Sequence, residues 1–248
     1  AGDTMVYYGA MNEAASGKFF TSNPFTQEPQ RSRLLQPIWL VHGWIQRITH
    51  LPVEVVYHAI RISFVVIFCW GLWQLTGLVS ASLSTRWKVH FVLVFGSGFG
   101  WVDYLLIRKG SSYDLWVSEF NPFLTMMHSS LFMISQLLMI WLILRWWRMM
   151  RDNQVRWWWG GVAAFLGLFH PYDLVTIGLT CFFVLLSPIV AGTANRKHLI
   201  NCVFAVAWLV PLALYYRWVL QEPVLLAWAK QNVDRLGPVW QIVLGAGF

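Results

Sequence analysis

Three ionisable residues recur at helical spacing near the start of the first long apolar run. Glu54, His58 and Arg61 occupy positions i, i+4 and i+7, which places them on one face of a helix. Ionisable side chains at membrane depth mark a candidate functional site, and a guanidinium can hold a phosphate through two hydrogen bonds. An ion pair between Glu54 and Arg61, bridged by His58, explains the same spacing without a ligand.

A second pattern is the sequence His-Pro-Tyr-Asp at 170–173. A residue before proline avoids the α region and proline favours the first helical position, so one helix should end at His170 and another begin after it. Asp173 would then complement the dipole of the second helix. This account does not require a histidine. We therefore predict that His170 donates to a phosphate, or binds a metal ion together with Asp173.

Acidic residues form two further groups. Asp3 is the lone acid of its turn, where it can act as a general base or as the N-cap of the helix that follows. The run 114–122 alternates polar with aromatic residues, as an interfacial loop or a substrate lid would, although simple solvation is the better explanation for any single residue in it. Within this run Glu119 is a candidate functional carboxylate.

Other polar features have structural explanations. His128 lies inside an apolar segment, where a hydrogen-bonded core histidine is the usual case. The glycines at 96, 98 and 100 lack the strand, helix and spacing of a dinucleotide loop, which favours close helix packing or a kink. The three cysteines lie in apolar stretches without metal-ligand spacing.

The composition is that of a membrane protein. Of 248 residues, 57% are hydrophobic and only 12% are charged, and the mean hydropathy is +0.53. Seventeen Trp and seventeen Phe residues suit the boundary between headgroups and hydrocarbon. A net charge of +7 would suggest nucleic acid in a soluble protein, but basic residues here hold cytoplasmic loops against anionic lipid. We therefore expect the lipid bilayer, and no nucleic acid, as a partner.

Apolar runs long enough to cross a bilayer predict spans at 52–79, 88–107, 122–144, 172–190 and 199–219, with a shorter run at 157–169. Arginine and lysine gather in three alternate connections between these runs, which the positive-inside rule makes cytoplasmic. The flanks 1–51 and 220–248 and the connection 108–121 then lie on the other side. Ten of the eleven acidic residues fall on or near that side.

Two segments predict helices that are not simple membrane spans. As a single helix, 157–190 would extend about 50 Å, too long for one span, so we predict two helices with a recessed pocket at His170. In 34–49, apolar residues recur at helical spacing, which predicts a helix lying in the membrane interface.

The expected organisation is all-α. A non-cytoplasmic loop with interfacial helices occupies 1–51, and a transmembrane bundle of about six spans occupies 52–219. A further non-cytoplasmic loop and the start of another span follow at 220–248. The chain opens without an initiator methionine or signal peptide and ends within an apolar run, so we expect it to be an internal part of a longer protein that lacks the first and the C-terminal membrane helices.

The N-terminal loop and the first span carry a series of short motifs. The loop opens with Asp3 and continues through Gly17-Lys18-Phe19-Phe20-Thr21-Ser22-Asn23-Pro24-Phe25-Thr26-Gln27-Glu28-Pro29, and the span contains Tyr57-His58-Ala59-Ile60-Arg61. With the segments 114–123, 170–173 and 228–232, this pattern resembles the GT-C superfamily of membrane glycosyltransferases. The resemblance is strongest to bacterial relatives of the transferases that use polyprenyl-phosphate-linked sugars.

The resemblance implies a GT-C-like bundle in the bacterial inner membrane with its active face outward. It implies inverting transfer of a sugar from a polyprenyl-phosphate donor to an acceptor hydroxyl. Asp3 matches the catalytic acid of the first loop in that family. The candidate residues for substrate and lipid phosphate are Arg61, His58, His170, Asp173 and Glu119.

Two questions stay open at the level of sequence. Better-known members have paired acids where this chain has Asp3 alone, so catalytic competence and metal dependence are undecided; a divalent cation would be held by Asp3, His170 or Asp173. The alternative function is a non-catalytic GT-C-like subunit or scaffold among other membrane subunits. A transporter is disfavoured because transporters bind near the midplane, whereas the charged groups here gather at one face.

Overall fold

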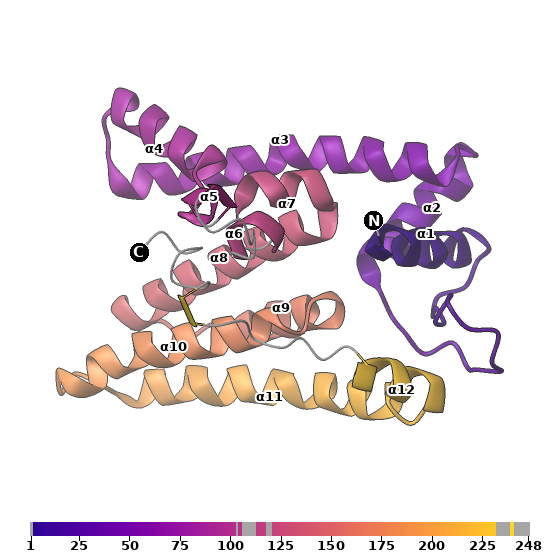
Figure 1. Cartoon of the computed structure of the whole chain (residues 1–248). Helices are drawn as coiled ribbons and strands as arrows, with labels where there is room; N and C mark the ends of the chain where they lie inside the picture. The colour runs from indigo at the N-terminus through magenta and orange to yellow at the C-terminus, as the bar shows by residue number, and fades with distance from the viewer. Residues whose placement is uncertain (1, 103, 106–112, 118–120, 232–238, 241–248) are drawn as a thin grey trace. The chain divides into compact units, whose positions relative to one another are not determined.

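Helices make up the regular secondary structure of the part of the chain that the structure describes. The computed structural model describes residues 2–102, 104–105, 113–117, 121–231 and 239–240. Its helices, shown in Figure 1, are α1 (Gly2–Ala15), α2 (Pro37–Thr49), α3 (Val53–Val79), α4 (Leu83–Phe95), α5 (Gly100–Val102), α6 (Tyr113–Trp116), α7 (Pro122–His128), α8 (Ser130–Arg151), α9 (Trp158–Phe169), α10 (Asp173–Val190), α11 (Arg196–Val219) and α12 (Pro223–Gln231). The prediction of an all-α protein is confirmed for these residues.

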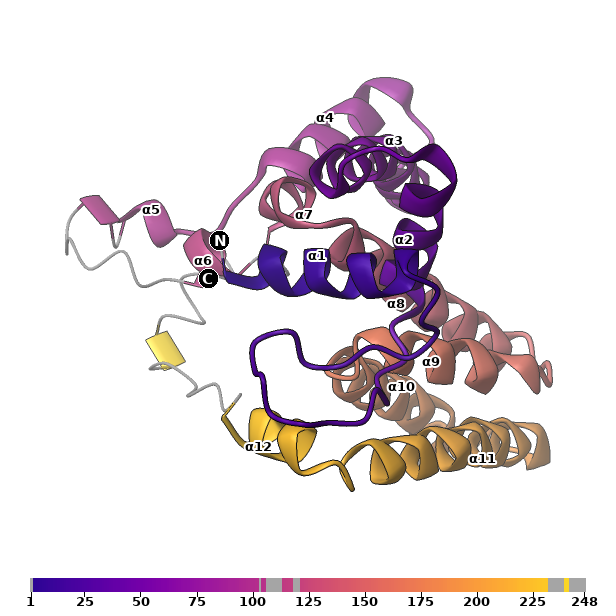
Figure 2. The ribbon, with the colours of Figure 1, turned by 90° about the vertical axis from the view of Figure 1, so that its right-hand side faces the viewer.

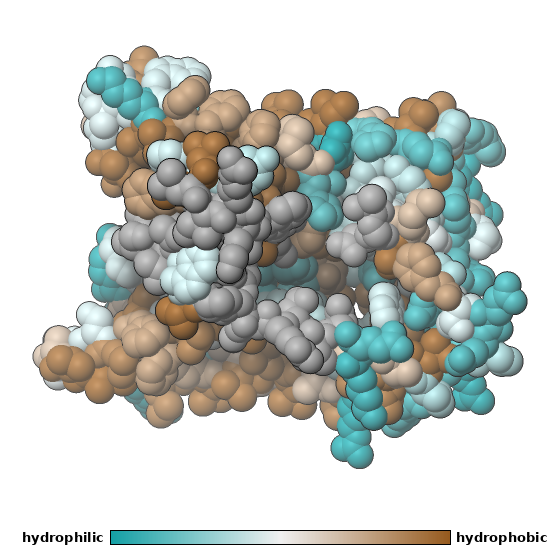
Figure 3. Space-filling model, in the orientation of Figure 1, coloured by the Kyte–Doolittle hydropathy of each residue, from teal (hydrophilic) through white to brown (hydrophobic). Residues whose placement is uncertain are grey.

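Four of these helices, α3, α8, α10 and α11, are long and apolar enough to cross a membrane. Few side chains of α3, α10 and α11 are nevertheless buried, and many of the apolar ones are exposed. Figure 3 shows apolar side chains along α10 and α11, and hydrophilic ones around α12 and the loop between α1 and α2. Long exposed apolar helices need a hydrocarbon solvent, so the structure indicates an integral membrane protein.

The helix predicted over 88–107 is shorter than expected. α4 ends at Phe95, where Gly96 takes an extended conformation (φ −67°, ψ 134°). Its 13 residues extend about 20 Å, less than the hydrocarbon thickness of about 30 Å. The glycine run therefore ends a helix at the point where the hydrophobic pattern alone would have continued it.

The span predicted over 122–144 is displaced along the chain. Asn121 caps α7 by accepting a hydrogen bond from the Phe123 backbone, and Pro122 begins the helix. Ser129 is extended, and the longer helix α8 starts after it and continues to Arg151. Of the arginines assigned to the connection after residue 144, Arg145, Arg148 and Arg151 consequently lie on the last turns of α8, and Arg156 follows the helix.

Two compact units divide the chain. The first comprises 1–57 and 138–233, and the second comprises 58–137 and 234–248, so α3 and α8 contribute to both. Each unit has its own buried apolar cluster. Leu142, Trp146, Leu166 and Ile177 belong to the first cluster, and Phe68, Leu72, Met126 and Met133 to the second.

In the first unit, α1 packs closely against α2. A Cβ atom at Gly43 would collide with the side chain of Ala14 and the carbonyl of Met11, so glycine permits this approach. The predicted helix over 34–49 is confirmed as α2. Its other face exposes the apolar residues Val41, Trp44, Ile45 and Ile48 at spacings of three and four. Such a stripe is what a helix lying in a membrane interface presents to lipid.

Buried His42 makes the packing of α1 on α2 sensitive to pH. Burial lowers the pKa of His42 to about 4, against the opposing effect of a hydrogen bond with the Ile38 carbonyl. The unfolded chain takes up a proton near pH 6.5 and the folded chain only near pH 4, so stability falls as pH drops through this window. The full loss is about 3 kcal/mol.

We compare hydrogen-exchange rates of residues 2–15 in the wild type and in His42→Leu at the same pH. The ratio of the wild-type rate to the variant rate should rise as the pH falls from 7 to 4.5. Leucine has no group that takes up a proton, and the Ile38 carbonyl still accepts the helical hydrogen bond from the backbone N–H of residue 42. Comparing the variants at each pH cancels the intrinsic pH dependence of exchange. Parallel exchange rates in the two proteins would contradict the role given to His42.

In the same unit, α8, α10 and α11 pack against α9 (Figure 1). Two buried indoles join neighbouring helices: Trp146 donates to the Cys181 carbonyl at 3.1 Å, and Trp159 donates to the Leu142 carbonyl at 2.9 Å. Gly160 lets α9 approach the backbone of α11 near Phe204. In a membrane these hydrogen bonds satisfy the only polar atoms of otherwise apolar side chains.

Candidate functional site

The break between α9 and α10 brings a histidine and an aspartate together. α9 ends at Phe169, His170 leaves the helical conformation (φ −143°, ψ 73°), and Asp173 begins α10. The predicted division of 157–190 into two helices is confirmed. Nδ1 of His170 lies 3.0 Å from Oδ1 of Asp173, and the two side chains are only 11% and 10% exposed.

The surroundings of this break are fixed by hydrogen bonds from α11. The Tyr216 hydroxyl donates to the Gly167 carbonyl at 2.6 Å, one turn before His170. The neighbouring Tyr215 hydroxyl accepts from the Leu35 backbone at 2.7 Å. The Arg33 guanidinium donates to the Trp218 carbonyl at 2.6 Å. The loop between α1 and α2 is thereby joined to the end of α11 that bonds to the last turn of α9 (Figure 2).

The contact between Asp173 and His170 determines which hydrogen bonds the imidazole can make. A carboxylate that accepts from Nδ1 fixes the tautomer and the orientation of the ring. When the imidazole is protonated, the same carboxylate is its counter-ion and Nε2 is a second donor. A buried pair of this kind can stabilise a negative charge that develops on a bound phosphate.

Asp3 lies in the first turn of α1, which begins at Gly2, so it follows the N-cap position. There a carboxylate also complements the helix dipole. Tyr7 is one turn further along the same face, and its ring stacks on Trp39 of α2 with centroids 4.3 Å apart. The side chain of Asp3 and the whole of Glu119 lie outside the described part of the chain.

In the second unit, Arg61 has a protein partner. Its guanidinium donates to the carbonyl of Met127, next to the break between α7 and α8. This bond, and not an ion pair with Glu54, is the contact the structure shows for Arg61. His58, on the same helix, is exposed. The assignment of both residues to a lipid phosphate stays a prediction.

For Asp114, the explanation of the run 114–122 by simple solvation is wrong. Its side chain is 1% exposed and accepts from the Ser97 hydroxyl at 2.5 Å and from the Gly100 backbone at 3.2 Å. A Cβ atom at Gly100 would collide with the carboxylate. The glycine run therefore also makes room for Asp114, a contact between segments that no local sequence pattern contains.

No group of three or more His, Cys, Asp and Glu side chains that could hold a metal ion occurs among the described residues. His170 and Asp173 together supply two such groups. Comparisons of the chain with protein-family models, with curated proteins and with solved structures find no match. The fold thus defines the class, a polytopic helical membrane protein, and the function has to be argued from the site.

Proposed function

We propose that this protein is a membrane glycosyltransferase of the GT-C type, which transfers a sugar from a polyprenyl-phosphate donor to an acceptor hydroxyl on the non-cytoplasmic face. The observation that carries the proposal is the buried His170–Asp173 pair at the end of a helix too short to cross the membrane. The four apolar spans and the sequence motifs that resemble this superfamily support it.

The proposed reaction is a single inverting displacement. The acceptor oxygen attacks the anomeric carbon, and the bond from that carbon to the phosphate oxygen breaks with its electron pair going to the phosphate. Asp3 takes the proton of the acceptor hydroxyl as general base. Protonated His170 donates to the departing phosphate, and Asp173 is its counter-ion. Phosphate is a fair leaving group, so positioning and charge stabilisation account for most of the catalysis.

Transfer by the full-length protein in proteoliposomes tests this proposal. A radiolabelled sugar on polyprenyl phosphate is supplied with a soluble acceptor, and the anomeric configuration of the product is read by nuclear magnetic resonance. Inverted product supports the proposal. If no polyprenyl-phosphate sugar is consumed, the protein is instead a non-catalytic subunit that keeps this architecture as a scaffold.

Arg61→Gln is expected to weaken binding of the polyprenyl-phosphate donor by about 10-fold, because a charge-assisted hydrogen bond to phosphate is lost. Binding is measured by competition with a fluorescent donor analogue. Lys88→Gln, which removes the same charge from exposed α4, is the matched control and should bind like the wild type. Unchanged binding by folded Arg61→Gln would limit Arg61 to its bond with Met127.

A further inference from the structure

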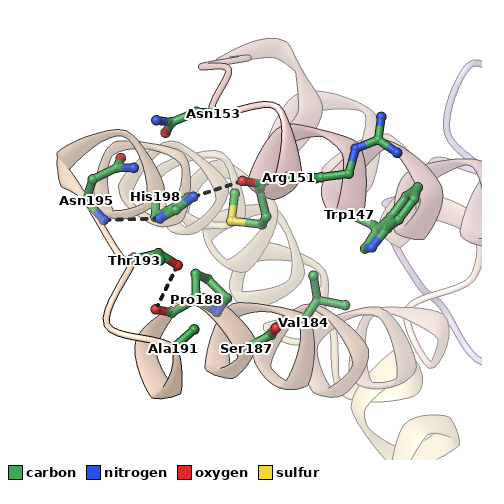
Figure 4. A pocket seen from close by; sticks show the side chains of 11 residues that line it. Trp147, Arg151, Asn153, Val184, Ser187, Pro188, Ala191, Thr193, Asn195 and His198 are labelled. Atoms are coloured by element: carbon green, nitrogen blue, oxygen red, sulfur yellow. Dashed lines mark hydrogen bonds between the residues drawn. The ribbon is translucent and has the colours of Figure 1, made fainter.

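A cavity of about 500 Å³ opens at the other end of α10 from His170 and Asp173. It lies between the last turns of α8, the end of α10 and the start of α11, all within the first unit (Figure 4). Polar and aromatic side chains line much of it: Trp147, Arg151, Asn153, Ser187, Thr193 and Asn195. Its volume is in the range of ligand pockets, roughly 300–1,000 Å³.

Hydrogen bonds fix the walls of this cavity. Nε2 of buried His198 lies 3.0 Å from the Met150 carbonyl, and its Nδ1 accepts from the Asn195 backbone at 3.2 Å. The Thr193 hydroxyl donates to the Pro188 carbonyl at 3.3 Å. The start of α11 is thereby joined to the end of α8, and the turn after α10 is closed on itself. The cavity is therefore part of the folded framework.

Among the described residues that line the cavity, Arg151 is the one with a permanent charge, and further basic residues lie near it in the sequence. The ends of α8 and α11 and the connection after α8 carry the basic residues Arg145, Arg148, Arg151, Arg156, Arg196 and Lys197 and the single acid Asp152. The Arg151 guanidinium bonds to Asp152 at 2.7 Å and lies 4.6 Å from the Trp147 ring centroid. The cationic group in the lining favours an anion as the occupant.

A separate apolar groove of about 260 Å³ lies further along α10, toward its start. Cys181 and Leu185 line the groove, and Val184 and Ser187 line the cavity on the adjacent turn. On α8, Trp146 faces the groove and its neighbour Trp147 faces the cavity. The polar cavity and the apolar groove thus lie on neighbouring turns of α10, as the two ends of an amphiphile require.

We propose that this cavity binds the phosphate headgroup of an anionic phospholipid, with one acyl chain lying in the groove along α10. Arg151 donates to the phosphate, the amides and hydroxyls of the lining bond to the remaining headgroup oxygens, and Trp147 covers the glycerol region. The site lies at the end of the unit that the sequence predicts to be cytoplasmic, where anionic lipids give the surface a negative potential. It is separate from the site proposed for sugar transfer.

Native mass spectrometry of the full-length protein with phosphatidylglycerol tests this inference. Arg151→Gln should weaken phosphatidylglycerol binding about 10-fold. Arg148→Gln removes the same charge one turn earlier, outside the cavity lining, and should bind like the wild type. Arg151→Gln combined with Asp152→Asn leaves the net charge of the wild type and should still bind weakly. Ala191→Trp, which fills the cavity, should abolish tight binding independently of charge.

Three results would overturn the inference. Equal weakening in Arg148→Gln and Arg151→Gln would mean that general surface charge attracts the lipid. Phosphatidylglycerol binding that survives Ala191→Trp would place the lipid elsewhere. Glycerol phosphate or inorganic phosphate binding as tightly as phosphatidylglycerol would show a site for a free phosphate, since the groove would then contribute nothing. Preference for phosphatidylglycerol over both phosphates and over phosphatidylcholine is the expected result.

Discussion

Asp3→Asn is expected to reduce the turnover of sugar transfer by about 100-fold or more while leaving donor affinity nearly unchanged. Asparagine keeps the shape of the side chain and most of its hydrogen bonding, but it cannot accept the proton of the acceptor hydroxyl. The proton transfer belongs to the chemical step, so the loss should appear in kcat rather than in donor binding. Single-turnover kinetics in proteoliposomes separates the two.

The matched control for this experiment is Asp152→Asn. It makes the same chemical change to an exposed acid at the other end of the unit and should leave turnover at the wild-type level. If Asp3 contributes only to the electrostatics of α1, Asp3→Asn costs less than about 1 kcal/mol of stability and transfer persists. Wild-type turnover by Asp3→Asn would therefore exclude the base assignment.

Replacing His170 by glutamine should lower kcat/KM by about 100-fold, because the donor to the developing phosphate charge is lost. Asp173→Asn should cost about 10-fold, since it weakens the orientation and charge of His170 without removing the ring. Because Asp173 acts through His170, the double variant should be no slower than His170→Gln alone. This non-additive cycle is the kinetic signature of the 3.0 Å contact between the two side chains.

The stability of the same four proteins separates catalysis from structure. If the pair serves only to join α9 to α10, each single change should lower the melting temperature, and the rate loss should follow the loss of folded protein. We expect instead that the rate loss persists at temperatures where every variant is folded. Rate losses that add in the double variant would contradict action of Asp173 through His170.

The parts of the fold that the sequence predicts are those with local physical causes. Pro171 forces the end of a helix at His170, and the spacing of apolar residues is enough to predict α2. The end of α4 at Phe95 was missed, because hydrophobic content continues through the glycines that break the helix. The start of α8 was misplaced for a similar reason: Ser129 leaves the helical conformation although its neighbours suit a helix.

In the candidate site, too, contacts between residues near in sequence could be predicted, and contacts between distant segments could not. His170 and Asp173 are three residues apart, so their pairing follows from the local turn. The burial of Asp114 depends on Ser97 and Gly100, more than ten positions away, and the partner of Arg61 is a carbonyl beside a helix break. Such contacts arise only when separate helices pack, and periodicity along the chain carries no information about them.

The apolar stripe of α2 has a mechanical consequence. A helix that lies in one leaflet pushes headgroups apart there and adds area to that leaflet alone. Its immersion is easiest where the bilayer curves convexly or where headgroups are small and loosely packed. Since α2 packs through Gly43 on Met11 and Ala14 of α1, we expect lateral pressure in that leaflet to act on the C-terminal part of α1. We therefore expect the lipid composition of the membrane to tune how closely α1 packs on α2.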